Sequence, residues 1–270
     1  MSRSMAAFTG AGAIFKRDLL IFMSYRTRFA STVVSRLVSL ILFYYVSRLV
    51  ASKAVGSSDE YFAFVVVGLI IFGVLTSTLA SPVATLRAEL QAGTFERMVV
   101  SPFGAVRSIA SLLAFPLALA LLLSLVSLAF AGAAFGLELR WATVPLAFPA
   151  GLLGALAFAP FGLAMTAAVV VFKQTNAGAT VIITGVSLFA GVYFPISLLP
   201  GWIRWTSDVQ PFTPAVDLMR NLLVGTPLHE SAVAEVAKLV GFAVVTLPLA
   251  LLLLRFAVNR SRARGTIIEY

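Results

Sequence analysis

The chain has 270 residues, of which 60% are hydrophobic and 11% charged, with a mean hydropathy of +1.00. A soluble domain of this length is about half apolar and a quarter charged, so this composition excludes a water-soluble fold and indicates a single transmembrane domain over residues 1–270. The absence of cysteine excludes disulfides and thiolate metal sites, and the single histidine argues against zinc binding and His-based catalysis. We assign the net charge of +9 to membrane orientation rather than to nucleic acid binding.

The N-terminal segment, residues 1–28, contains a basic and aromatic stretch at Phe15–Arg28. Its apolar residues do not form a clean face at helical periodicity, so its amphipathicity is modest. We expect an N-terminal helix that lies at the cytoplasmic interface, with a solvated leader as the alternative.

Six apolar stretches follow within residues 29–258, and each is long enough for the about 20 residues that a membrane-crossing helix needs. Proline and glycine in the fourth are tolerated where neighbouring helices satisfy the freed backbone groups. The sequence therefore predicts an all-α integral membrane protein with six transmembrane helices. The predicted spans are Phe29–Val50, Tyr61–Ala80, Val106–Phe130, Thr143–Phe172, Ala177–Pro195 and Val233–Val258.

Lysine and arginine are distributed unevenly among the connections. Most of them lie in residues 1–28, in the second-to-third connection, at position 173 (Lys173) and in the tail, residues 259–270. Cytoplasmic loops carry an excess of these residues, so we place both termini in the cytoplasm. An even number of spans also puts the termini on the same side.

Two connections are longer than turns require. The cytoplasmic connection Ser81–Ala105 contains helix formers at Ala84–Gln91 and is expected to hold a short coupling helix. The external segment Ile196–Ala232 is apolar and aromatic, with Thr213 as the expected N-cap of a short helix that ends at Gly225. Such a helix is too short to span, so we expect it to re-enter or lie on the outer leaflet between spans five and six.

Three motifs in this order resemble the type-2 (ABC-2) ABC permeases, whose bacterial members export drugs, lipids, polysaccharides and lipo-oligosaccharides. The first is Gly-Thr-Phe-Glu-Arg-Met at 93–98, followed by Ser-Pro at 101–102. The second is Gly-Val-Tyr-Phe-Pro at 191–195 with Leu-Pro at 199–200, and the third is Pro-Phe-Thr-Pro at 211–214 leading to Arg220 and Gly225. With a Lys-Arg-Asp entry at 16–18, the resemblance covers nearly the whole chain.

The resemblance implies the transmembrane subunit of an ATP-driven exporter in a bacterial cytoplasmic (inner) membrane. Two copies of the permease, forming a homodimer, would act with two copies of a cytoplasmic ATPase subunit. The cargo would be an amphipathic, lipid-linked or polysaccharide-type substrate, moved from the cytoplasm or the inner leaflet. The chain contains no Gly-Lys dipeptide and hence no phosphate-binding P-loop. ATP and Mg would therefore bind to the partner, and this chain would hold no cofactor and not be an enzyme by itself.

The cytoplasmic connection is the candidate contact with the ATPase. A charged helix flanked by glycine can occupy a groove of a partner, and we expect the charge of Glu96 to matter most. The alternative is a solvated loop whose charges only keep it in water. The candidate coupling residues are Arg87, Glu89, Gly93, Thr94, Phe95, Glu96 and Arg97.

Arg36 is the candidate substrate-path residue. It lies about 10 Å inside the first span at 1.5 Å per residue, and Thr32 and Ser39 share its helical face. Such a polar stripe suggests a cavity where arginine meets an anionic headgroup, whereas the alternative is snorkelling to the inner interface.

The external segment carries the third group of candidates. Its tryptophans form either an aromatic belt at the interface or a platform for exported cargo. The candidate residues are Pro195, Pro200, Trp202, Trp205, Pro211, Pro214 and Arg220.

Other functions fit the sequence less well. A secondary carrier or channel without an ATPase partner is the main alternative, but no Asp or Glu lies in the interior of a predicted span. A membrane-embedded enzyme would be restricted to Ser/Lys-type chemistry, because the chain has no Cys and a single His, at position 229 in the predicted external segment. A non-transporting membrane scaffold is a further alternative.

Overall fold

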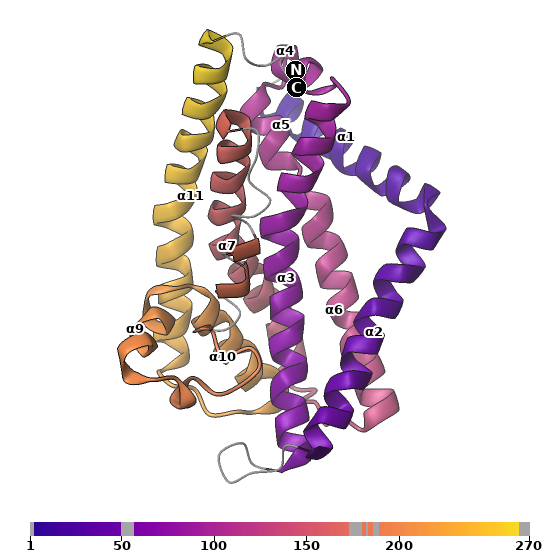
Figure 1. Cartoon of the computed structure of the whole chain (residues 1–270), viewed down its shortest axis with the longest axis vertical. Helices are drawn as coiled ribbons and strands as arrows, with labels where there is room; N and C mark the ends of the chain where they lie inside the picture. The colour runs from indigo at the N-terminus through magenta and orange to yellow at the C-terminus, as the bar shows by residue number, and fades with distance from the viewer. Residues whose placement is uncertain (1–2, 50–56, 173–179, 182, 186–188, 265–270) are drawn as a thin grey trace.

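The computed structural model describes residues 3–49, 57–172, 180–181, 183–185 and 189–264, with side chains described from residue 10 onward except for residue 28. Its elements form an elongated helical bundle, in which α3 and α7 run through the middle and α11 and α2 lie on opposite sides (Figure 1). The elements are α1 (Arg3–Ser24), α2 (Arg26–Leu49), α3 (Ser58–Gln91), α4 (Phe95–Val100), α5 (Ala105–Ser111), α6 (Ala114–Phe135), α7 (Val144–Phe172), η1 (Ile196–Leu198), α9 (Gly201–Val209), α10 (Phe212–Val224) and α11 (Ala232–Ala263).

Five helical stretches are long and apolar enough to cross a membrane: Phe29–Leu49, Ser58–Gln91, Ala105–Phe135, Val144–Phe172 and Ala232–Ala263. They correspond to five of the six predicted spans. The predicted fifth span, Ala177–Pro195, falls largely outside the described residues, and its described positions 180–181, 183–185 and 189 are helical. The six-span arrangement therefore stays a prediction.

The N-terminal helix is longer than Phe15–Arg28. It begins at Arg3 and ends at Ser24, and Tyr25 interrupts the helix before α2. The two helices meet at a sharp bend (Figure 1).

The second span does not end where a loop was expected at Ser81. Instead, α3 continues through Pro82 to Gln91, so the predicted helix at Ala84–Gln91 is the last part of a single 34-residue helix. Its start is fixed by a capping box, in which Ser57 and Glu60 exchange side-chain-to-backbone hydrogen bonds of 3.2 and 2.8 Å. The separate short helix at this end is α4.

Close packing of α7 against its neighbours depends on two glycines. A Cβ at Gly154 would lie 3.1 Å from the Cβ of Ala215 in α10, and a Cβ at Gly162 would collide with the backbone carbonyl of Thr78 in α3. Small residues let membrane helices approach closely, which maximises van der Waals contact where lipid supplies no hydrophobic drive. These contacts place α7 at the centre of the bundle, between α3, α10 and α11.

The described part of the predicted external segment folds as η1, α9 and α10 at one end of the bundle, which we call the α10 end (Figure 1). The expectation that Thr213 caps the short helix is wrong, because α10 begins at Phe212 with Pro211 in the N-cap position. Gly225 ends it as expected, with a left-handed φ of 81° that favours glycine.

The opposite end, which we call the α4 end, contains α4, the first turn of α1 and the last turn of α11 (Figure 1). The predicted tail, residues 259–270, does not begin as a separate segment, because α11 continues to Ala263. Residues 265–270 lie outside the described residues.

Candidate functional site

The turn between α3 and α4 holds the central candidate residues. Gly93 adopts a φ of 67°, which favours glycine, and no atom lies within 4 Å of the position that its Cβ would take. The backbone N–H of Thr94 donates to the Glu89 carbonyl at 3.0 Å, and the Thr94 hydroxyl also donates to the Glu89 carboxylate. The turn therefore reverses the chain tightly and starts α4 next to the end of α3.

One face of α4 is buried and the other is exposed. Phe95 and Met98 are buried in an apolar cluster that also includes residues of α3, α5, α7 and α11. Glu96, Arg97 and Val100 are exposed at the end of the bundle. A short helix anchored in the core on one side thus presents charge and an apolar side chain on the other.

Two further contacts fix this end of the molecule. The Arg262 guanidinium in the last turn of α11 donates to the Val99 carbonyl at 2.7 Å. Arg17 of α1 lies 2.7 Å from a Glu89 oxygen and 2.8 Å from an Asp18 oxygen. Burial raises the pKa of Asp18 even though Arg17 lowers it. A movement of α4 would therefore disturb contacts with α1, α3 and α11.

The structure separates the coupling candidates into two groups. Glu96 and Arg97 face outward, whereas Glu89, Thr94 and Phe95 hold the turn together from inside. Arg87 is half-buried along α3 and does not belong to the exposed face of α4.

Arg36 lies in α2 with its guanidinium against Gly73, near the middle of α3, where a Cβ would collide with it. It lines two cavities. The larger, of about 740 Å³, extends to Glu89 and Thr94 at the α4 end, and the smaller, of about 320 Å³, extends to Tyr193. Thr32 lines the larger cavity and Ser39 the smaller one. The predicted polar stripe therefore borders both cavities.

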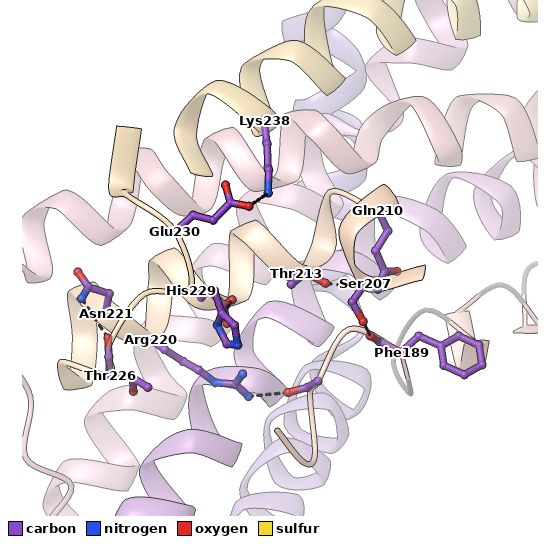
Figure 2. A network of polar contacts seen from close by, with 12 residues as sticks. Phe189, Ser207, Gln210, Thr213, Arg220, Asn221, Thr226, His229, Glu230 and Lys238 are labelled. Atoms are coloured by element: carbon purple, nitrogen blue, oxygen red, sulfur yellow. Dashed lines mark hydrogen bonds and ion pairs between the residues drawn. The ribbon is translucent and has the colours of Figure 1, made fainter. Parts of the chain in front are cut away.

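At the α10 end, Arg220 is 2% exposed and satisfies backbone groups of two other segments. It donates to the carbonyls of Phe64 at 3.1 and 3.2 Å, Gly191 at 2.8 Å and Val192 at 3.2 Å, and its guanidinium lies 3.3 Å from the centroid of the Phe64 ring. Burial lowers the pKa of Arg220 to about 9, which leaves it charged at neutral pH. Figure 2 shows this side chain reaching from α10 to the segment before η1.

Sequence reasoning missed the partner of the single histidine. His229 Nδ1 lies 3.0 Å from a carboxylate oxygen of Asp217, which is buried in α10. Burial raises the pKa of Asp217, although His229 and Arg220 lower it. An acidic residue three positions before Arg220 in an apolar helix was a usable signal for Asp217, but nothing local pointed to His229. Nearby, the Lys238 amine lies 2.6 Å from Glu230, and Ser207 donates to the Phe189 carbonyl at 2.6 Å (Figure 2).

The remaining external candidates serve two purposes. Pro195, Pro200 and Pro211 occupy the N-cap positions of η1, α9 and α10, and Pro214 is buried. Trp202 and Trp205 are 76% and 61% exposed on α9.

Within the described residues, no group of three or more His, Cys, Asp or Glu side chains could hold a metal ion.

Comparison with known proteins gives one family and two curated relatives. The family described as ABC-2 type transporter matches residues 10–224. Nodulation protein J of Rhizobium meliloti (strain 1021) is 28% identical over 116 residues, which are 43% of this chain and 44% of that protein. Nodulation protein J of Rhizobium leguminosarum bv. trifolii is 28% identical over 89 residues, which are 33% of this chain and 34% of that protein. The chain thus spans less than half the length of these relatives.

Proposed function

The chain belongs to the ABC-2 type transporter family, and on that premise we propose that it is the membrane-spanning subunit of an ATP-driven exporter. The family and the long apolar helices make it a multi-pass membrane protein. In this proposal, ATP and Mg bind to separate ATPase subunits. The present chain supplies the transport pathway and the surface that receives the conformational change of the ATPase.

The observation that carries the proposal is the two-faced helix α4. Its buried face is anchored among α3, α5, α7 and α11, so a push on α4 reaches the central helices directly. Its exposed Glu96, Arg97 and Val100 offer charge pairs around an apolar contact, a combination suited to a transient protein interface.

The basic residues near the α4 end indicate the orientation of the chain in the membrane. We place the α4 end, with both termini, in the cytoplasm of a bacterial cell and the α10 end outside the cytoplasmic membrane. Arg255, Arg260, Arg262 and Arg264 at the end of α11 support this orientation, because basic residues remain on the cytoplasmic side.

A second copy of the chain completes the proposed complex. Much of α2 faces away from its own bundle, and its exposed apolar residues include Val34, Val38, Leu42 and Tyr45. A homodimer, with two ATPase subunits, would cover part of this surface and leave the rest to lipid.

The alternative function is a secondary carrier or channel that needs no ATPase. The buried carboxylates of Asp217 and Glu235 are the observation in its favour, since buried acids can carry coupling protons. Neither residue lines the two cavities at Arg36, so they lie apart from the path that we propose.

Purification of the tagged chain from its native membrane tests the proposal. We expect a P-loop ATPase to co-purify, and Glu96→Arg to weaken its retention about tenfold while leaving the yield of folded permease unchanged. Glu138→Arg, which reverses an exposed charge at the α10 end, should retain the ATPase fully. Recovery of folded, transport-active permease without any P-loop subunit would favour the carrier.

A further inference from the structure

Arg36 and Gly73 define a charged position inside the membrane that the bundle does not neutralise. Arg36 is the eighth residue of the apolar stretch Phe29–Leu49, so it lies about 10 Å from the start of that stretch at 1.5 Å per residue. A cation at this depth is costly unless a counter-charge or hydrogen-bond acceptor reaches it. Within the described residues, the ion pairs and hydrogen bonds of the structure do not include the Arg36 guanidinium.

Arg220 shows how this chain treats an arginine whose role is structural. Its guanidinium is saturated by three backbone carbonyls and covered by an aromatic ring. The Arg36 guanidinium instead lies on the backbone of Gly73, where the absent side chain leaves room for it. This position near the middle of α3 is not the one expected of a side chain that snorkels to the α4 end.

The surroundings of Arg36 combine hydroxyl groups with apolar walls. The larger cavity runs from the Arg17–Glu89 pair at the α4 end to Arg36, and Ser77, Ser81 and Thr85 of α3 line it. The smaller cavity continues beyond Arg36 and is lined by Ser39, Thr76 and Ser127 together with Leu40, Phe43 and Phe72. Arg36 is the one charged residue among those that line the smaller cavity.

In the larger cavity the other charges already have partners. Arg17 forms ion pairs with both Asp18 and Glu89, whereas Arg36 forms an ion pair with neither carboxylate, so its guanidinium is the one charged group in the described lining that has no ion-pair partner. Guanidinium groups bind phosphate through charge-assisted, often bidentate hydrogen bonds, which strengthen where water is sparse.

We propose that Arg36 binds the phosphate group of an amphiphilic ligand between the two cavities, with the neighbouring hydroxyls completing its coordination and the apolar walls holding the attached chain. The site rests on the proposed transport function, which it deepens by naming a phosphate-bearing amphiphile as the ligand class. The same phosphate chemistry is present in a lipid headgroup and in free inorganic phosphate.

Lipid binding to the purified full-length chain tests this site without ATP or an ATPase. Native mass spectrometry would compare dioleoyl phosphatidic acid with diolein, which has the same acyl chains but no phosphate. We expect the wild-type chain to bind the phosphate-bearing lipid at least about tenfold more tightly, and Arg36→Gln to abolish this preference. Arg36→Lys should retain part of it, because the charge remains but the planar fork is lost.

Two further variants separate the site from general charge and from misfolding. Arg26→Gln removes an exposed cation from the same helix and should leave the preference unchanged. Gly73→Ala keeps every charge but displaces the guanidinium, so it should weaken the preference as Arg36→Gln does. Arg36→Gln itself should fold, since it removes a membrane-embedded charge that forms no ion pair or hydrogen bond within the described residues.

Inorganic phosphate in the same assay identifies the source of the ligand. Displacement of the lipid by millimolar phosphate in the wild-type chain would assign the site to free phosphate, and a lack of displacement would assign it to the lipid headgroup. Equal preference for the phosphate-bearing lipid in the wild type and in Arg36→Gln would overturn the proposal. Because ATPase retention is measured separately, that outcome would leave the proposed function standing.

Discussion

Arg220 ties three segments that are far apart in the sequence. Its guanidinium donates to carbonyls of α3 and of the Gly191–Val192 turn while its backbone belongs to α10. A buried backbone carbonyl without a donor costs free energy comparable to a lost hydrogen bond, so this one side chain stabilises the fold of the whole α10 end. The Pro-Phe-Thr-Pro motif that leads to Arg220 could be recognised from the sequence, but the carbonyls that Arg220 contacts could not, because they lie 28 to 156 residues away.

We expect Arg220→Lys to destabilise the protein by about 2–4 kcal/mol, because an ammonium cannot reach all three carbonyls. Arg204→Lys is the matched control, since Arg204 is exposed and donates to carbonyls of its own segment, and its effect should stay within about 0.5 kcal/mol. Thermal unfolding in detergent measures both. Equal melting temperatures for the two variants would show that the Arg220 contacts are dispensable.

Asp217 predicts a pH dependence. Burial raises its pKa above the ordinary 3.8, against the lowering effect of His229, Arg220 and Lys238. A carboxyl group with a raised pKa in the folded protein costs stability as pH rises through that range, and the cost is absent below the ordinary pKa. Asp217→Asn should therefore melt at a higher temperature than the wild type at about pH 7.5, with a gain that shrinks as the pH falls towards about 4.5. A lower melting temperature at neutral pH would mean that the contact with His229 outweighs burial.

At the scale of elements, hydropathy located the spans because lipid forces each crossing helix to be long and apolar. It failed at Ser81, where the predicted connection begins although α3 continues through Pro82 to Gln91. Pro82 has no N–H for the Thr78 carbonyl, yet the helix continues, and Gly162 of α7 packs against that carbonyl. This accommodation depends on a contact 80 residues away, so local sequence could not indicate it.

Gly162→Ala tests this accommodation. The new Cβ would collide with the Thr78 carbonyl, which belongs to a rigid helix, so we expect a loss of roughly 2 kcal/mol or more in stability. Gly241→Ala in α11 is the control, because no atom lies within 4 Å of its Cβ position and alanine favours a helix. The control should be neutral or slightly stabilising. If Gly162→Ala left the stability unchanged, α3 and α7 could move apart without a loss of free energy.

The candidate sites divide in the same way between local and distant signals. The glycine at position 93 and the charge at position 96 are readable from their motif, and the structure brings them to one turn and one exposed face. The Arg17–Glu89 pair and the Arg262–Val99 contact join helices across the bundle, and no spacing rule points to them. Sequence thus indicates which segment could meet a partner, while only the fold shows what that segment is attached to.

At the scale of the whole molecule, the two ends of the bundle differ in character. The α4 end has the basic last turns of α11 and the exposed charges of α4, whereas the α10 end has the exposed tryptophans of α9. We expect cysteines at Asp208 and Ser231 to react with an impermeant thiol reagent added outside intact cells, and cysteines at Ala92 and Arg264 to react only after lysis. All four positions are exposed. Labelling of position 92 from outside would reverse the orientation.

We propose that an ATPase contacts the α4 end. Val100 and Val233 form a matched pair, because they are 81% and 79% exposed. Val100 belongs to α4 and Val233 to the first turn of α11, which lie at opposite ends of the bundle (Figure 1). A photo-reactive amino acid placed at either position, followed by irradiation of intact membranes, reports which end meets the ATPase without knowledge of the cargo. We expect a covalent adduct between position 100 and a P-loop ATPase, and none from position 233. An adduct from position 233, or none from position 100 in a complex that still co-purifies, would contradict it.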